Sequence, residues 1–230
     1  MKLDNIPVQN NILENYFNSD KSSNLTKILN KEINIAVWKR KIDEEIQTIS
    51  KEIVNNFPNL DLCEVIESKD VVDFLIKNIG SNKKFNKLYK DISNLVNIFC
   101  TLSDKKNAWL RINAIDKPMC PRFHVDYNKL RLLTTYCGPS TEWLPNCLVD
   151  RNKLGSGSSG LSDEFSGLYN QKIDIQQIST GDVAVIKGEA WNDNDGQGLV
   201  HRSPHTNTDY ERLYLTIDFP ELYESVYQNF

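Results

Sequence analysis

Histidine is scarce in this chain of 230 residues, which contains only His124, His201 and His205. Cysteine is little more frequent: the five cysteines are widely spaced, no two form a CxxC pair, and an odd number cannot all pair. These features argue against a disulfide framework and favour buried, reduced thiols. A zinc site that includes Cys120 and His124 stays open as an alternative, although structural zinc prefers clustered thiolates.

An excess of positive charge is also missing. The formal net charge is −4, and lysines alternate with acidic residues through the first hundred positions, as on a solvated helix surface. No apolar run is long enough to cross a bilayer, and the opening segment MKLDNIPVQNN lacks the apolar core of a signal peptide. We therefore expect a cytoplasmic protein that binds neither nucleic acid nor membrane. The sequence leaves the oligomeric state open.

The first 103 residues are predicted to form a helical extension. Residues 1–30 are polar and rich in Asn, Asp and Ser, which predicts a loosely ordered lead-in. Apolar residues then recur every three or four positions, which is the spacing of amphipathic helices, in the segments 42–57, 71–79 and 88–99. The apolar faces of these helices are expected to pack on a core and to carry no chemistry.

Strands replace helices in the prediction from residue 104 onward. Strand-forming residues gather in short segments separated by turn formers: 109–112, 130–136, 172–178, 182–187 and 212–219. Such a succession favours an antiparallel sandwich or barrel. We therefore expect an α+β protein in which a helical extension, 1–103, packs on a β core, 104–230. The Gly/Ser-rich stretch 155–167 is predicted to be a mobile loop, either a surface insertion or a lid beside a site.

The segment RFHVD places His124 and Asp126 two positions apart. On an extended strand such residues project from the same face, so both side chains can reach one ion. Two histidines and one carboxylate form the facial ligand set of non-haem Fe(II) oxygenases, which leaves coordination positions open. His201, which follows a turn-rich segment and a short apolar entry, is the candidate second histidine. His205, in the loop SPHTNTD, is a weaker alternative.

Arg212 lies eleven residues after His201 and opens the strand RLYLTIDF. An arginine on that strand can return beside the metal, where its planar fork can grip a carboxylate. A metal triad with such a clamp is suited to binding a 2-oxo acid. Arg202 is expected to face away from the metal in a structural ion pair. The side to which Arg131 and Thr135 point is left open.

This order of residues resembles the 2-oxoglutarate/Fe(II) dioxygenases, in which an HxD pair is followed by a distant histidine and, about eleven residues later, an arginine. The stretch 138–145 (GPSTEWLP) is similar to the segment that follows the HxD strand in many such enzymes. The stretch 179–186 (STGDVAVI) is similar to the strand before their distal histidine. The resemblance covers about residues 107–220. The whole pattern also resembles an uncharacterised bacterial domain family with a helical N-terminal portion.

The resemblance implies a double-stranded β-helix, or jelly-roll, core and an oxygenase that uses Fe(II) and 2-oxoglutarate. Iron would be held by His124, Asp126 and His201, and the distal carboxylate of the oxo acid by Arg212. Tyr214 stands where many relatives carry a small hydroxyl residue that helps bind the same carboxylate. The substrate, a small molecule or a protein side chain, is not indicated.

Two alternatives stay open. One is a cupin-like metalloprotein that uses the same triad without an oxo acid, with zinc or manganese in place of iron. The other is a non-catalytic metal-binding or sensing module linked to metal homeostasis. Both predict metal binding, so metal content alone does not separate them from an oxygenase.

Overall fold

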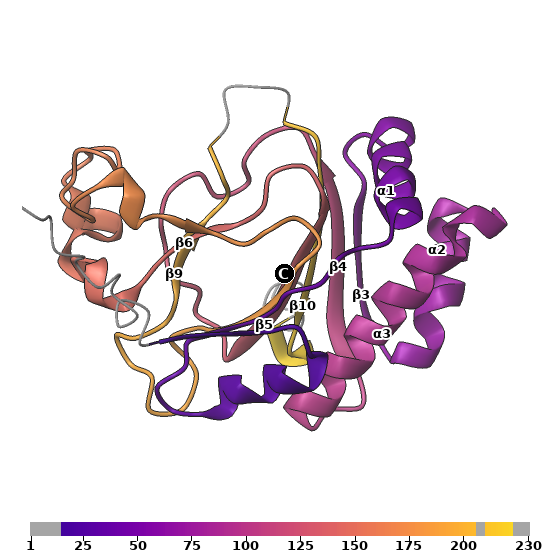
Figure 1. The fold of residues 1–230 in the computed structure, drawn as a ribbon, viewed down its shortest axis with the longest axis horizontal. Coiled ribbons are helices and arrows are strands. Elements are labelled where there is room, and N and C mark those ends of the chain that lie inside the picture. The colour runs from indigo at the N-terminus through magenta and orange to yellow at the C-terminus, as the bar shows by residue number, and fades with distance from the viewer. Residues whose placement is uncertain (1–14, 206–209, 223–230) are drawn as a thin grey trace, which may run out of the picture.

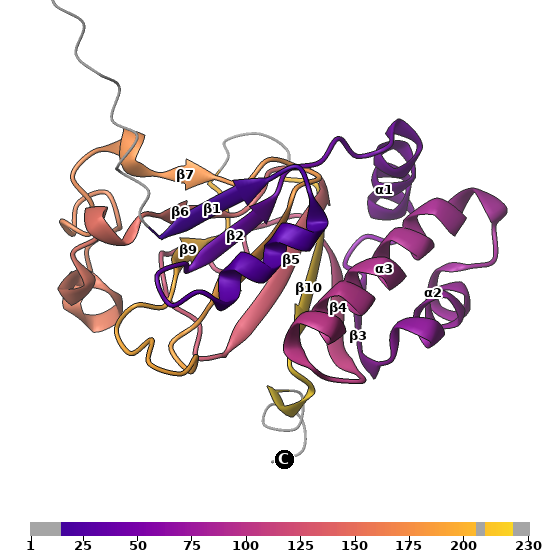
Figure 2. The same cartoon turned by 60° about the horizontal axis from the view of Figure 1, so that its bottom comes forward.

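A seven-stranded sheet dominates the structure, a computed structural model that describes residues 15–205 and 210–222 (Figure 1). Its strand order is β1-β2-β8-β5-β10-β4-β3, with bounds Tyr16–Ser19, Ile35–Trp38, Val183–Lys187, Leu130–Cys137, Arg212–Asp218, Ala108–Ile115 and Asp61–Ile66. Neighbouring strands are antiparallel except β1 and β2, which are parallel. Figure 2 shows β1 and β2 toward one edge of the sheet and β3 and β4 toward the other.

A second, three-stranded sheet has the order β7-β6-β9, with bounds Gln176–Gln177, Glu142–Leu144 and Val200–Arg202. A further short segment joins its edge, because His124 forms an antiparallel bridge with His201 of β9. The chain from β4 onward therefore passes back and forth between the two sheets. Buried apolar side chains pack between them, including Trp143 of β6, Leu133 of β5 and Ala184 of β8.

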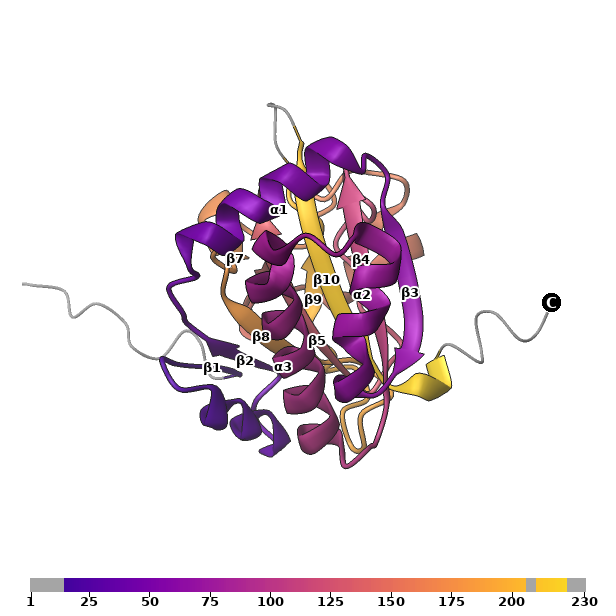
Figure 3. The ribbon, with the colours of Figure 1, turned by 90° about the vertical axis from the view of Figure 1, so that its right-hand side faces the viewer.

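The large sheet has one apolar face and one face on which polar and apolar side chains are mixed, because alternate residues of a strand point to opposite sides. The apolar face packs against three helices: α1 (Glu44–Asn56), α2 (Val71–Ile79) and α3 (Asn86–Ser103) (Figure 3). Its strands contribute leucines and isoleucines such as Leu110, Ile112, Leu215 and Ile217. The helices thus cover the apolar face and leave the polar residues of the same strands directed toward the small sheet.

The three helices coincide with the segments whose apolar spacing predicts them, but the first 103 residues are not simply helical. They also supply β1, β2 and β3 to the large sheet, none of which the sequence analysis predicts. The predicted loose lead-in is wrong over residues 15–30, where Ser22–Leu29 forms a 3-10 helix that buries Leu25 and Ile28. Residues 1–14 of that lead-in lie outside the described part of the chain.

Local interactions and backbone conformation account for the start of α1 and the end of α2. The side chain of Asp43 accepts a hydrogen bond from the Glu45 amide, 2.8 Å away, and so caps the start of α1. Gly80 follows α2 with a φ of +130°, a backbone conformation that glycine adopts readily. Among residues 15–205 and 210–222, no helix combines the length and the apolar character needed to cross a bilayer.

Candidate metal centre

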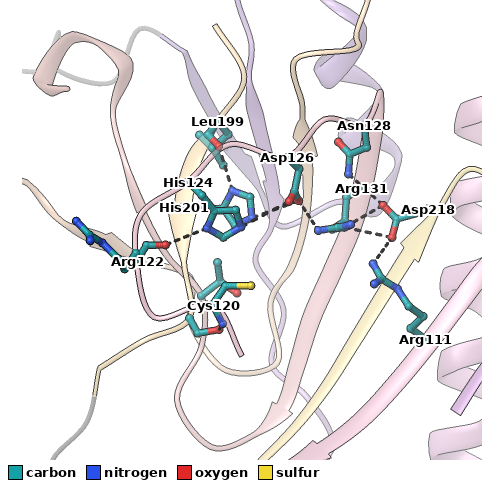
Figure 4. Close-up of polar contacts among 12 residues, drawn as sticks. Arg111, Cys120, Arg122, His124, Asp126, Asn128, Arg131, Leu199, His201 and Asp218 are labelled. Atoms are coloured by element: carbon teal, nitrogen blue, oxygen red, sulfur yellow. Dashed lines mark hydrogen bonds and ion pairs between the residues drawn. The ribbon is translucent and has the colours of Figure 1, made fainter. Parts of the chain in front are cut away.

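The structure brings together the side chains of His124, Asp126 and His201 (Figure 4). One potential ligand atom from each residue lies within 4.8 Å of the other two. The Asp126 carboxylate has one oxygen 3.5 Å from His124 Nε2 and the other 3.4 Å from His201 Nε2. Because the backbones of the two histidines are paired, with both N···O distances at 3.0 Å, the imidazoles emerge side by side.

The second nitrogen of each imidazole is held by a backbone carbonyl. His124 Nδ1 lies 3.0 Å from the Arg122 oxygen, and His201 Nδ1 lies 3.0 Å from the Leu199 oxygen. A carbonyl only accepts hydrogen bonds, so each neutral ring donates its Nδ1–H and keeps a lone pair on Nε2. Both lone pairs are therefore available on the side of Asp126, as metal-binding histidines require.

Electrostatics favour an ionised carboxylate at the centre of this cluster. Burial acts to raise the pKa of Asp126, but the charges of His201 and Arg131 and hydrogen bonding to His124 hold it well below its ordinary value. Burial likewise acts to lower the pKa of His124, yet its hydrogen bonds to Asp126 and the Arg122 carbonyl leave it above the ordinary value. When a metal ion takes the place of the Nε2 protons, two imidazoles and this carboxylate are a donor set that suits a divalent transition metal.

Behind the carboxylate lies a buried chain of charges. Arg131 of β5 forms an ion pair with Asp126 and donates from Nε to Asp218, 2.9 Å away. Asp218 is fully buried at the end of β10, and it also accepts from Arg111 at 2.7 Å and Asn128 at 3.1 Å. Two arginines and an amide thus share one carboxylate, which fixes the Arg131 guanidinium against Asp126.

Arg212 lies on the same face of the large sheet and is only 1% exposed. Its Nη2 donates to the hydroxyls of Thr135 and Thr141, both 3.0 Å away, and its guanidinium stacks 4.0 Å from the ring centre of Tyr214. No carboxylate within residues 15–205 and 210–222 forms an ion pair with it. A buried arginine without a carboxylate partner is a natural site for an anionic ligand.

The backbone around Arg212 is shaped to bring its strand close to β5. Gly138, with a φ of +81°, sits so near the chain that an added Cβ would lie 2.0 Å from the Glu211 oxygen. Only glycine fits there. A bulge at Leu213 and Tyr214 shifts the register between β10 and β5, and bulges commonly redirect side chains beside functional sites.

One pocket of about 110 Å³ joins the cluster to Arg212. That is several times the roughly 10–15 Å³ needed for one water molecule. Residues from both sheets and from the segment before His124 line it, among them His124, Asp126, His201, Arg111, Arg212 and Tyr214. All five residues predicted for the site therefore face one cavity. His205 and Cys120 are not part of the ligand cluster, although Cys120 lines the pocket.

The sequence analysis left open the side to which Arg131 points, and it did not identify Arg111 and Thr141, which line the pocket, or Asp218, which pairs with Arg111 and Arg131. For Asp218 the sequence did contain a signal. The segment RLYLTID alternates with period two, which puts Arg212, Tyr214, Thr216 and Asp218 on one face of the strand. Arg202 is buried in ion pairs with Glu142 (2.7 Å) and Asp163 (3.1 Å), as expected, but it also lines the pocket of the candidate ligands.

The stretch 155–167 is packed rather than free, contrary to the predicted mobile loop. It begins with a 3-10 helix, Gly155–Ser158, and its Asp163 is buried. Asp163 accepts hydrogen bonds from the Phe123 amide at 2.9 Å and from Arg202 at 3.1 Å. Because Phe123 precedes His124 and Arg202 follows His201, this one carboxylate holds both histidine-bearing segments.

Residues 19–218 match the model of a family described as "Protein of unknown function (DUF1826)". The chain belongs to the DUF1826 family. The predicted membership of an uncharacterised family is thereby confirmed. A search of curated proteins found no match for this DUF1826 chain.

Three solved structures are among those to which the chain is distantly similar. The dioxygenase for auxin oxidation 1 from Arabidopsis thaliana, bound to 2-oxoglutarate, is 12% identical, with a TM-score of 0.46 over 89% of this chain and 91% of that one. A full-length Neurospora crassa protein in complex with alpha-KG is 9% identical, with a TM-score of 0.47 over 94% and 88%. A Pseudomonas putida prolyl-4-hydroxylase is 6% identical, with a TM-score of 0.46 over 86% and 98%. These likenesses are too distant to assign an activity to the DUF1826 chain.

Proposed function

We propose that this protein is an Fe(II)- and 2-oxoglutarate-dependent oxygenase that acts on an unidentified substrate. One observation carries the proposal: the His124, Asp126 and His201 cluster opens into the same pocket as Arg212, a buried arginine with no carboxylate partner among the described residues. A ligand that bears a carboxylate at one end and metal-binding oxygens at the other would satisfy both features at once.

The residues fit a resident iron. Both imidazoles present Nε2 and Asp126 presents an ionised oxygen, so three ligands would occupy one side of the metal and leave the other side open. Fe(II) would supply the activation of dioxygen there. Arg131 holds the Asp126 carboxylate in place, and the carbonyls of Arg122 and Leu199 fix the two rings.

The residues around Arg212 fit the distal carboxylate of 2-oxoglutarate. Thr135 and Thr141 orient the guanidinium through its Nε and Nη2, and the N–H groups of Nη1 can donate to a carboxylate. The Tyr214 phenol can donate to the same group in place of a small hydroxyl residue. Burial of the clamp keeps water away from the salt bridge and strengthens it.

The proposal extends to the fold and the cellular setting. A chain that passes between a four-strand unit, β8-β5-β10-β4, and the small sheet has the strand arrangement of a double-stranded β-helix. We infer such a core within residues 104–230, with residues 1–103 packed on it. A cytoplasmic location and a substrate that is a small molecule or a protein side chain belong to the same proposal.

A cupin-like metalloprotein or a metal sensor with the same triad would need no anion clamp. Either would leave the Arg212 charge buried without a counter-ion, which is costly. The unpaired arginine therefore favours the oxygenase over both alternatives.

Anaerobic reconstitution tests the proposal. Fe(II) followed by 2-oxoglutarate should produce a weak visible charge-transfer band. His124→Ala should abolish the band, and Arg212→Gln should lower the affinity for 2-oxoglutarate at least tenfold. Lys117→Gln, which removes an exposed positive charge outside the pocket, is the matched control and should behave as wild type. If iron binds and no band forms at millimolar 2-oxoglutarate, the oxygenase assignment is wrong.

A further inference from the structure

Another of the arginines that line the pocket, Arg111, lies well away from Arg212. Arg111 of β4 pairs in register with Thr216 of β10, which lies four residues beyond Arg212. Four residues of extended strand span about 13 Å. The Arg111 side chain reaches further toward the strand end, because its Nη2 donates to Asp218. An oxo acid held by Arg212 and the metal would therefore leave Arg111 free for another group.

The Arg111 guanidinium is only partly satisfied within the protein. It stacks 4.2 Å from the ring centre of Trp109 and contacts Asp218 at 2.7 Å. Its Nε is buried, yet no hydrogen-bond acceptor lies within reach among the described residues. A buried N–H group without an acceptor is costly, so the site is arranged to receive one from a ligand.

The charges around the pocket also indicate that Arg111 receives an anionic group from a ligand. In the loaded site, positive charge would come from Arg111, Arg131, Arg212 and a divalent metal, and negative charge from Asp126, Asp218 and a dianionic oxo acid. One positive charge is left over. Arg202, which also lines the pocket, belongs to a separate group in which two arginines, Arg122 and Arg202, face two carboxylates, Glu142 and Asp163. Buried charges are normally paired, so a further anionic group is needed.

We propose that the substrate is a small molecule that carries an oxyanion, a carboxylate or a phosphate, and that Arg111 binds this group. The proposal rests on the proposed oxygenase function and names the substrate class of the same site. Met119 and Cys120 line the pocket and offer a sulfur-bearing surface to the carbon part of the molecule.

Binding of simple anions to the protein loaded with Zn(II) and saturating 2-oxoglutarate tests this assignment without turnover. Propionate and methyl phosphate are the probes, and they distinguish a carboxylate from a phosphate; propionamide is the neutral match of propionate. Ligand-observed NMR should detect at least one anion with millimolar affinity and much weaker binding of propionamide. Arg111→Gln should weaken anion binding at least tenfold, while 2-oxoglutarate affinity changes less than threefold.

Two further variants distinguish a specific anion site at Arg111 from a general effect of positive charge and from a loss of folding. Lys117→Gln should bind the anions as wild type does. Arg111→Lys keeps the charge beside Asp218, and with it the fold, but has no Nε–H; it should weaken anion binding several-fold. Anion binding that is unchanged in both Arg111 variants, or propionamide binding that equals propionate binding, would overturn the assignment. If 2-oxoglutarate fails to bind while propionate binding still depends on Arg111, the oxygenase function fails and the anion site stands.

Discussion

Asp218 is the residue on which the buried charges of the pocket depend. It accepts from Arg111, Arg131 and Asn128 and is fully buried. We expect Asp218→Asn to lower the free energy of unfolding by about 3–5 kcal/mol, because it leaves two partly buried arginines without their shared counter-ion. Chemical denaturation of the metal-free protein measures the change.

The control for that variant is Asp116→Asn, which removes an exposed carboxylate. A surface substitution of this kind should stay within about 0.5 kcal/mol of wild type. A loss in Asp218→Asn no larger than the control would mean that the charge network contributes nothing to stability.

At the residue scale, the sequence was most informative where spacing alone constrains geometry. The i, i+2 spacing of His124 and Asp126 predicts their shared face, and the structure places them together. The pairing of Arg131 with both Asp126 and Asp218 was not predictable, because it depends on β5 lying next to β10. Such neighbours are set by the packing of strands far apart in sequence.

The stretch 155–167 acts at the scale of elements, through Asp163. We expect Asp163→Asn to lower the free energy of unfolding by about 1–3 kcal/mol, since Asp163 accepts from a buried arginine and a buried amide. Metal affinity should fall as well, because the segments that carry His124 and His201 lose their common anchor.

Calorimetric titration of Zn(II) into the variant measures this second effect. Asp193→Asn is the control: Asp193 is exposed and has a φ of +57°, which asparagine tolerates. Zinc affinity in Asp163→Asn equal to that of the control would show that the stretch is a passive insertion.

Tyr89 links two helices. Its hydroxyl, on α3, donates to the carbonyl of Gly80 at the end of α2, and burial raises the pKa of Tyr89 to about 12. The unfolded-state value is about 10, so this phenol stabilises the fold fully below pH 10 and progressively less as pH rises from 10 to 12. Tyr89→Phe should cost about 1 kcal/mol at pH 8 and show a shallower loss of stability at alkaline pH.

Urea unfolding at pH 8 and pH 11 measures how far the free energy of unfolding falls with pH in Tyr89→Phe and in wild type. Tyr127→Phe, at a side chain that is 83% exposed, is the control and should follow wild type at both pH values. Parallel pH dependences of Tyr89→Phe and wild type would contradict the assigned role.

The helices were predictable because each repeats its apolar residues over several turns. The strands β1 and β2 were not: each has only four residues, and the buried sequence IAVW of β2 lacks the alternation that marks a half-exposed strand. Their placement depends on β8, whose residues Val183–Ile186 pair with β2 from a distant part of the sequence. Local patterns do not contain that information.

In the whole molecule, helices cover the apolar face of the large sheet, and its other face, which carries the polar residues of the pocket, is directed toward the small sheet. Sequence patterns predict the alternation within each strand, but the closing of two sheets around one pocket follows from long-range pairing of β4, β10 and β5. As a result the candidate ligands, near the small sheet, and Arg212, in the large sheet, face one cavity. A ligand that contacts both would bridge the two sheets.

The coupling between the binding of the metal and the binding of 2-oxoglutarate is the most direct test of the proposed oxygenase site. If one ligand is held by the metal at His124, Asp126 and His201 and by Arg212, the two binding events must strengthen each other equally. Calorimetric titration of 2-oxoglutarate under anaerobic conditions should give at least tenfold higher affinity with Fe(II) than without it, and the gain should disappear in His201→Ala. Equal affinities with and without iron would contradict the account.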